Sequence, residues 1–421
     1  MKDTQKGRRD FLQKLAAGAA ATITIPAWAG QQKEALQKAT ANPDEAYWQK
    51  VKEQFAVPAH LMMVNAANLC PSPVSISQQV NATLNDLGKD VSFQFRARFT
   101  EKRQKSLESL AVFLGVAREE VGITRNTSES NNIVVNGLDL KPGDEVLLWD
   151  QNHYSNALSW DERAKRFGFT VKRFQTPADP SGKEEILRIV ENAMTPSTRV
   201  LAFSHISDTT GQAMPAEELC QLARTRKVLT LVDGAQSFGF MNLNLQQMGC
   251  DFYSASTHKW LMGPLENGVL YVKKESLPLL WPQVISAGWK PQSITTDEKL
   301  CLFGQRNETT PFALPETIAF HESISRANIE ARVRALNARL REQIQSKVPG
   351  ASFVSPSRAE MTGGITIVNI NGKKPQDIYN NLYTQYGIAG APSGGVRLSP
   401  HIYNTMSDID RIVSALVKLA S

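Results

Sequence analysis

The chain has 421 residues, of which 42% are hydrophobic and 21% charged, as in an ordinary soluble globular protein. Its formal net charge is +6, but residues 1–29 hold five basic and two acidic side chains, so a net +3 belongs to this short segment. No later run of Lys and Arg carries interleaved aromatic residues, which argues against a nucleic-acid partner.

Residues 1–29 have the pattern of an export signal. Arg8 and Arg9 precede an apolar run over residues 15–25, and Ala27 and Ala29 are small residues at the positions that a signal peptidase recognises. The run is too short to span a bilayer comfortably. Paired arginines before Phe-Leu resemble the twin-arginine signal. We therefore expect cleavage after Ala29, export through the twin-arginine translocase and a periplasmic protein; a Sec signal or an uncleaved anchor is the alternative.

After a polar linker at residues 31–42, short apolar runs alternate with helix-like segments. Runs with charged or turn residues at their ends are typical of central parallel strands, and we predict such strands at 144–149, 199–203 and 227–232, with a further strand at 268–272. Helices are predicted between them at 156–167, 183–192 and 215–226. Strands and helices in alternation predict a doubly wound α/β domain.

A helical stretch without strong breaks, residues 314–347, predicts the connection to a smaller C-terminal α+β domain. That domain contains predicted strands at 364–370 and 396–399, a helix near 375–385 and a closing helix after Asn404. The predicted organisation is a signal peptide at 1–29, a linker and N-terminal segment at 30–89, a large domain at 90–313 and the connecting helix with the small domain at 314–421.

Two linked motifs carry the chemistry. Leu-Val-Asp233-Gly-Ala-Gln236 ends a buried strand, and Ser256-Thr-His258-Lys259-Trp-Leu-Met-Gly-Pro follows some twenty residues later. An acid at the carboxyl end of such a strand lies where open α/β sheets bind ligands. A lysine is a poor nucleophile while protonated, and partial burial favours the neutral amine that attacks an aldehyde.

These motifs resemble those of the class V aminotransferases, a family of fold-type I pyridoxal phosphate enzymes that includes cysteine desulfurases, kynureninase and isopenicillin N epimerase. The resemblance extends from about residue 65 to the C-terminus. It implies a large, mostly parallel doubly wound sheet domain with a smaller C-terminal α+β domain. It also implies that Lys259 carries pyridoxal 5'-phosphate as a Schiff base, with His258 beside it. Asp233 would pair with the pyridinium nitrogen so that the ring accepts electrons, and Gln236 would lie near the phenolate oxygen.

The resemblance places the cofactor phosphate at the start of a helix. Residues 121–124 are predicted as a strand, and the next residues open a helix in which Thr127 and Ser128 occupy the family's Thr-rich element. Backbone N–H groups and hydroxyls at a helix N-terminus form an anion site. Ser256 would add another hydroxyl. By itself the stretch is an ordinary helix N-cap.

Other positions are assigned by the same resemblance. Tyr154 would stack on the cofactor ring, whereas His153 is interpreted as a structural neighbour. Asp208 stands where many relatives have Asn, which puts the usual hydrogen bond to the ring oxygen in doubt. Arg397 would bind the substrate α-carboxylate. Gln305 lies in a Gly-Gln-Arg element that would reach the partner subunit's phosphate in a homodimer.

The absence of one cysteine reduces the number of reactions that the resemblance allows. Desulfurases need a cysteine on the loop before the C-terminal arginine, and residues 387–395 contain none. We therefore favour the isopenicillin N epimerase-like branch, with transamination or epimerisation of an amino acid or an amino-acid-containing peptide. The alternatives are desulfurase-like or C–S lyase-like elimination, and a catalytically silent exported protein that binds such a ligand. The four scattered cysteines suggest no metal site.

Overall fold

The computed structural model describes residues 38–421, so the predicted export signal and its cleavage site lie outside the described residues. Within this range, no helix is both long enough and apolar enough to cross a membrane.

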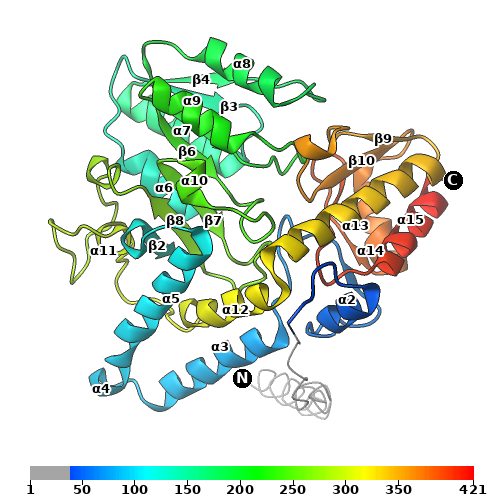
Figure 1. Ribbon diagram of the computed structural model, residues 1–421, viewed down its shortest axis with the longest axis horizontal. Coiled ribbons are helices and arrows are strands. Elements are labelled where there is room, and N and C mark those ends of the chain that lie inside the picture. The colour runs from blue at the N-terminus through cyan, green and yellow to red at the C-terminus, as the bar shows by residue number, and fades with distance from the viewer. Residues whose placement is uncertain (1–37) are drawn as a thin grey trace, which may run out of the picture. The chain divides into compact units, whose positions relative to one another are not determined.

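A seven-stranded sheet forms the centre of the larger part of the fold (Figure 1). Its strand order is β2-β8-β7-β6-β5-β3-β4, and the central strands β7, β6, β5, β3 and β4 run parallel, whereas β8 is antiparallel to both of its neighbours. The sheet is therefore mostly parallel, as predicted. The strands are β2 (Val121–Thr124), β3 (Glu145–Trp149), β4 (Thr170–Phe174), β5 (Thr198–Ser204), β6 (Leu229–Asp233), β7 (Phe252–Ser256) and β8 (Gly268–Val272).

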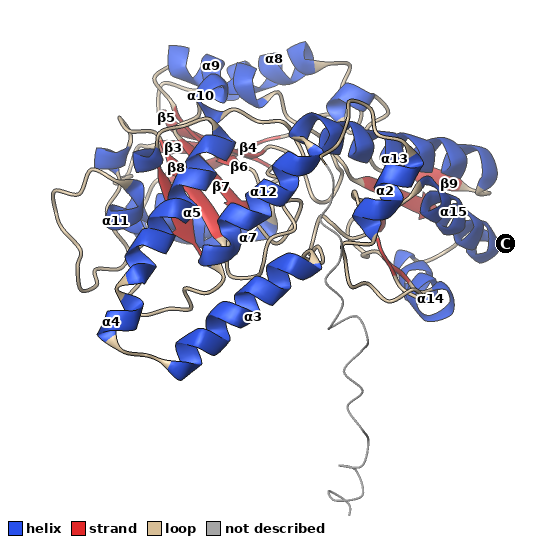
Figure 2. Ribbon diagram, turned by 60° about the horizontal axis from the view of Figure 1, so that its bottom comes forward, coloured by secondary structure: helices blue, strands red, loops and turns tan. Residues whose placement is uncertain are grey.

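Both faces of this sheet are buried, because alternate residues of its strands belong to two different apolar clusters. In β3, Leu147 and Trp149 join one cluster, whereas Val146 and Leu148 join the other. Helices cover the sheet on both sides (Figure 2). They include α5 (Arg98–Leu114), α6 (Thr127–Gly137), α7 (Tyr154–Phe167), α8 (Lys183–Ala193), α9 (Ala216–Thr225), α10 (Leu245–Met248) and α11 (Thr296–Leu300). This is the α/β architecture that the alternating pattern predicts.

The predicted helical stretch 314–347 is two helices. α12 (Leu314–Ile324) and α13 (Arg326–Lys347) are separated by Ser325, whose φ is +75°. A left-handed residue cannot continue an α-helix, and the Ser325 side chain caps α13 by accepting a hydrogen bond from the Asn328 N–H. α13 runs from the large sheet to the smaller one (Figure 1).

The smaller C-terminal sheet is antiparallel, with the order β12-β10-β9. Its strands are β9 (Ala351–Phe353), β10 (Thr366–Ile370) and β12 (Val396–Leu398), and α14 (Pro375–Tyr386) and α15 (Met406–Ala420) pack in the same apolar cluster. The N-terminal segment also joins this part, because β1 (Met62–Met63) pairs in parallel with β11 (Ile388–Ala389). The remaining helices of this segment are α2 (Glu45–Lys52), α3 (Val74–Lys89) and α4 (Phe93–Arg96).

Candidate active site

Three polar residues lie side by side at the carboxyl ends of the central strands. Asp233 of β6 is in register with Ser204 of β5 on one side and Ser254 of β7 on the other. Asp233 is buried. The carboxyl end of a parallel sheet is where α/β proteins bind ligands, so the fold places the predicted acid at the expected edge.

Two buried asparagines orient the Asp233 carboxylate. Asn131 Nδ2 donates to Asp233 Oδ2 over 2.8 Å, and Asn156 Nδ2 approaches the same oxygen at 3.4 Å. The N–H of Ala235 donates to the other oxygen, Oδ1, over 3.1 Å. A buried charge needs such donors. We did not predict a role for Asn131; its signal is a buried amide next to the apolar run that begins at Ile133 of α6.

Lys259 lies on a tight turn directly after β7. The N–H of Met262 donates to the Lys259 carbonyl over 2.9 Å, and Met262 has a φ of +59°, which is strained for a residue with a side chain. Burial lowers the pKa of Lys259, and the nearby carboxylates of Asp233 and Asp208 oppose this effect. The turn therefore presents an amine whose neutral form is favoured by its surroundings.

Trp260 is the residue of this turn that contacts the surrounding structure through side chain and backbone. Its indole Nε1 donates to Gln236 Oε1 over 2.8 Å, and its carbonyl oxygen lies 2.8 Å from His401 Nε2 and 3.3 Å from His321 Nε2. The Gln236 Nε2 donates to the Ala67 carbonyl over 2.8 Å. The Gln236 side chain thus joins the lysine turn to Ala67, and its predicted contact with the cofactor ring stays a prediction.

The predicted phosphate residues lie together at the start of α6. The Thr127 N–H donates to Ser256 Oγ over 2.8 Å, and the two hydroxyl oxygens are 2.6 Å apart. The Ser128 hydroxyl lies 3.1 Å from that of Ser155 at the start of α7. Asn126 caps α6. A cluster of hydroxyls and N–H groups at a helix N-terminus suits a phosphate dianion.

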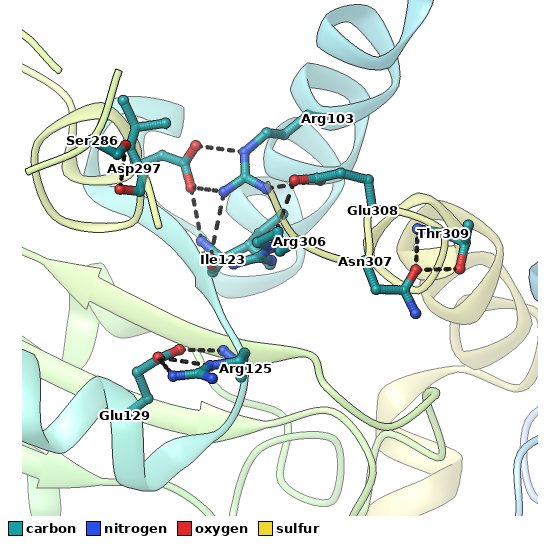
Figure 3. Close-up of polar contacts among 11 residues, drawn as sticks. Arg103, Ile123, Arg125, Glu129, Ser286, Asp297, Arg306, Asn307, Glu308 and Thr309 are labelled. Atoms are coloured by element: carbon teal, nitrogen blue, oxygen red, sulfur yellow. Dashed lines mark hydrogen bonds and ion pairs between the residues drawn. The ribbon is translucent and has the colours of Figure 1, made fainter. Parts of the chain in front are cut away.

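Neighbouring residues hold this helix start in place (Figure 3). Glu129 accepts hydrogen bonds from the backbone N–H of Arg125, over 2.7 Å, and from its guanidinium. The carboxylate therefore stabilises the first turn of α6 through both the cap and the helix dipole.

At the predicted stacking position, the ring of Tyr154 is exposed and the neighbouring ring of His153 is partly buried. Tyr154 is 76% exposed and makes no ring contact within residues 38–421. His153 is half-buried; its N–H donates to Ser204 Oγ over 3.3 Å, and its Nδ1 lies 2.8 Å from Ser155 Oγ. The stacking role of Tyr154 stays a prediction, and so does the structural role of His153, whose backbone N–H contacts the end of β5.

Two further predicted residues face one another. Arg397 Nη1 lies 3.6 Å from Asp208 Oδ2 and donates to the Asp208 main-chain oxygen over 3.0 Å. The predicted carboxylate-binding arginine therefore has an acid beside it. His258 is half-buried, and burial lowers its pKa to about 4, with the charge of Lys259 acting in the same direction.

Gln305 lies outside this group of residues. It is exposed on a loop, while the adjacent Arg306 is anchored by a hydrogen bond of 3.1 Å from Nη1 to the Ile123 carbonyl (Figure 3). Ile123 belongs to β2, just before the phosphate residues. The loop is thus fixed at its base with Gln305 directed to the surface, and the contact of Gln305 with a partner's phosphate stays a prediction.

The assembled residues fit pyridoxal phosphate in their chemistry. The side-chain amine of Lys259 makes no hydrogen bond within residues 38–421, so it is available for a bond to an aldehyde. The buried Asp233 offers an anion for a ring nitrogen, and the hydroxyls of Thr127, Ser128 and Ser256 offer donors for a phosphate.

Solved structures with the same fold include pyridoxal enzymes. A cysteine desulfurase from Thermococcus onnurineus superposes with a TM-score of 0.79 at 22% identity, over 88% of this chain and 97% of that one. A C-DES variant with glycine covalently linked to its PLP cofactor superposes with a TM-score of 0.80 at 21% identity, over 89% and 99% of the two chains. These likenesses establish the fold.

Comparison with relatives by sequence shows the family as well as the fold. Isopenicillin N epimerase from Amycolatopsis lactamdurans is 30% identical over 89% of this chain and 98% of its own length. A probable cysteine desulfurase from Methanothermobacter thermautotrophicus is 27% identical over 85% and 94% of the two chains. The family described as aminotransferase class-V, whose cofactor is pyridoxal phosphate, matches residues 67–412, and the chain belongs to this family.

Proposed function

We propose that the protein is a pyridoxal phosphate enzyme that acts on an amino acid or an amino-acid-containing peptide. It either transfers the amino group of this substrate or epimerises the carbon that carries it. The observation that carries the proposal is the placement of Lys259 beside Asp233, Asp208 and Arg397, whose charges all act on its amine. The cofactor supplies an aldehyde carbon that bonds to amines and a ring that withdraws electrons. The protein must bind the substrate and move protons.

Each of these tasks has a residue. Asp233, held by Asn131 and Asn156, would keep a proton on the ring nitrogen. Lys259, whose pKa is lowered by burial, would take a proton from the substrate α-carbon and return it. Return by Lys259 to a different carbon would give transamination, whereas epimerisation would need an acid that delivers a proton to the opposite face of the α-carbon. The choice depends on where the proton is delivered.

The cysteines argue against desulfuration, which requires a thiolate nucleophile. All four are buried and free. Burial raises the pKa of Cys70 and of Cys220 to about 12, and it also raises the pKa values of Cys250 and Cys301 well above the ordinary thiol value. The loop between β11 and β12, which carries the nucleophile in desulfurases, has no cysteine. Elimination without a protein thiol is the alternative reaction.

The first experiment tests the cofactor bond. We expect the purified protein to absorb in the near-visible region and to lose that band on reduction with borohydride. The reduced cofactor should then be found covalently bound to Lys259. Lys259→Ala should lack the band, and Lys274→Ala, which removes an exposed lysine after β8, should keep it. If the protein is catalytically silent and binds no cofactor, the wild type and both variants will lack the band.

The second experiment separates the reactions. A screen of amino donors should convert the cofactor to its amino form if the enzyme transfers amino groups. Exchange of the α-proton with solvent deuterium, without that conversion, would identify epimerisation. Release of sulfide or pyruvate from cysteine would identify elimination and would remove our preference. No change with any donor would identify a protein that binds the ligand without turnover.

We also propose that the enzyme is exported after folding. Twin-arginine export carries folded proteins, and pyridoxal phosphate is made in the cytoplasm, so a periplasmic pyridoxal enzyme has reason to bind its cofactor before export. The supporting feature is Arg8-Arg9 before an apolar run. Replacing both with Lys should leave holoenzyme in the cytoplasm. Normal export of that variant would contradict this pathway.

We further propose a homodimer whose loops complete each other's sites. Gln305 is exposed on an anchored loop, and large apolar side chains at Phe93, Tyr154 and Trp281 are more than two-thirds exposed in the single chain. Exposed apolar side chains of this size are typical of interaction surfaces. Light scattering should give twice the mass of the mature chain, and a monomeric mass with full cofactor occupancy would contradict the proposal.

A further inference from the structure

Asp208 and Arg397 form a pair of opposite charges beside Lys259. Asp208 Oδ2 and Arg397 Nη1 are 3.6 Å apart, and the two side chains are 15% and 7% exposed. The Asp208 charge raises the pKa of Lys259 and the Arg397 charge lowers it. Both charges therefore act on the space in which the substrate amine reacts.

The hydrogen-bonding capacity of this pair is only partly used. Arg397 donates from Nη1 to the Asp208 main-chain oxygen and from Nη2 to Asn65 Oδ1 over 3.2 Å, but its buried Nε has no partner within residues 38–421. The Asp208 carboxylate accepts no hydrogen bond from the same part of the chain, since 3.6 Å is too long for one. One residue thus keeps a free donor and the other a free acceptor.

Each residue is also held in place by its own backbone hydrogen bonds. Asp208 lies in a turn closed by hydrogen bonds of 2.9 Å from the Ser207 N–H to the Gln212 carbonyl and from the Gly211 N–H to the Ser207 carbonyl. Gly211 has a φ of +75°, which only glycine adopts readily. Arg397 lies in β12, paired with Ile367 of β10. The two charges come from the large and the small sheet regions and are preorganised.

The small-sheet region also packs directly on the Asp208 turn. A side chain at Gly394 would place its Cβ 2.3 Å from the Thr209 carbonyl, so this position requires glycine. The glycine-rich loop at residues 387–395 therefore serves close packing at Gly394. The spacing of Asp208 and Arg397 is fixed by this contact.

A simple monoamino acid does not match this pair. Its amine would react at Lys259, and its carboxylate would meet Arg397 together with a second carboxylate from Asp208, which repels it. A group with an ammonium next to a carboxylate matches both charges, because the carboxylate faces the guanidinium and the ammonium faces the acid. That arrangement leaves a different amine of the same molecule to react.

We propose that Asp208 and Arg397 bind the zwitterionic head of an α-amino acid, so that the substrate is a free diamino acid that reacts through its other amine. This inference rests on the proposed function. Asp208 is then the specificity-determining residue, because Arg397 alone would accept any carboxylate.

The test measures binding without turnover. Borohydride reduction of the holoenzyme fixes the cofactor to Lys259, and calorimetry then compares L-norvaline, which carries the zwitterionic head, with pentanoate, which carries the carboxylate alone. We expect L-norvaline to bind at least about tenfold more tightly. Asp208→Asn should remove this preference and strengthen pentanoate binding. Asp150→Asn, at the end of β3 without an ion pair to Arg397 within residues 38–421, is the matched control.

The outcomes separate the two proposals. Absence of a reducible near-visible band would overturn the proposed function itself. A normal band with equal affinity for the two ligands, or a preference unchanged in Asp208→Asn, would overturn only the zwitterion site. In the unreduced enzyme, L-ornithine should be turned over faster than L-norvaline if the site is correct, whereas a peptide with a C-terminal ornithine, whose α-nitrogen is acylated and uncharged, should not.

Discussion

Asn131 and Asp233 are joined by a hydrogen bond of 2.8 Å although they are 102 positions apart in the chain. Asn131 also accepts a hydrogen bond of 2.5 Å from the Ser254 hydroxyl. The amide of α6 thereby connects the ends of β6 and β7. Since all three residues are buried, the asparagine provides donors and acceptors that water cannot supply.

We expect Asn131→Ala to lower the free energy of unfolding by about 1–3 kcal/mol, because a buried carboxylate and a buried hydroxyl each lose a partner. Denaturant titration of the protein without cofactor would measure the loss. Asn132→Ala is the control, since the half-buried side-chain amide of Asn132 on the same helix makes only one hydrogen bond within residues 38–421, to the Ser128 carbonyl one turn earlier. An equal loss of unfolding free energy in the two variants would show that the contact of Asn131 with Asp233 does not add to stability beyond an ordinary hydrogen bond.

Thr127 and Ser256 are expected to set the affinity for the cofactor phosphate. Removing one hydroxyl that donates to a charged group costs about 1.5–3 kcal/mol, so Ser256→Ala and Thr127→Val should each weaken pyridoxal phosphate binding by about tenfold to a hundredfold. Equilibrium dialysis would measure the change. Pyridoxal, which lacks the phosphate, is the matched ligand, and its binding should be unchanged. An equal loss for both ligands would place the phosphate elsewhere.

The sequence was sufficient to predict the central strands because short apolar runs with polar ends are characteristic of buried parallel strands. It also predicted the acid and the lysine, since both belong to local motifs. Strand direction was harder, because a short apolar run such as 268–272 reads the same in either orientation, and β8 is antiparallel. The break at Ser325 was missed because serine only rarely adopts a positive φ.

Contacts between distant segments could not be predicted. The pairing of Met62 with Ile388, which joins the N-terminal segment to the small sheet, depends on the complete fold. The same holds for Arg397 and Asp208, which are 189 positions apart. For Arg397 the motif predicts an arginine in the site, but only the structure shows that an acid lies beside it.

The two histidines at the Trp260 carbonyl predict a loss of stability in mild acid. Burial lowers the pKa of His401 to about 4 and that of His321 to about 3. Below pH 6.5, the unfolded chain takes up protons at these residues and the folded chain does not. The free energy of unfolding should therefore fall as the pH drops from about 6.5 toward 4, by at most about 1.4 kcal/mol per pH unit for each histidine.

Denaturant titrations at pH 7, 6 and 5 would measure this slope. His401→Gln and His321→Gln keep a side-chain donor for the Trp260 carbonyl but cannot take up a proton, so each should make the slope shallower. His60→Gln replaces an exposed histidine and should leave the slope as it is. A slope that is unchanged in both buried-site variants would show that other groups cause the acid sensitivity.

A buried ion-pair network supports the segment that leads into the phosphate site (Figure 3). Arg103 of α5 contacts Asp297 of α11 through two hydrogen bonds of 2.8 Å, and Asp297 Oδ1 also accepts from the Ile123 N–H of β2 over 3.0 Å. Glu308 lies 3.2 Å from the same guanidinium. The single carboxylate of Asp297 thus joins two helices to the edge strand that precedes Thr127.

We expect Asp297→Asn to lower the free energy of unfolding by about 3 kcal/mol, because it leaves the Arg103 charge buried with Glu308 as its remaining acid. Glu298→Gln, an exposed position on the same helix, should change it by less than about 0.5 kcal/mol. The double variant Arg103→Met with Asp297→Asn should recover part of the loss, since the unpaired charge is removed. If the double variant is instead less stable by the sum of the two single losses, then the two residues act independently and the network has no role in holding β2.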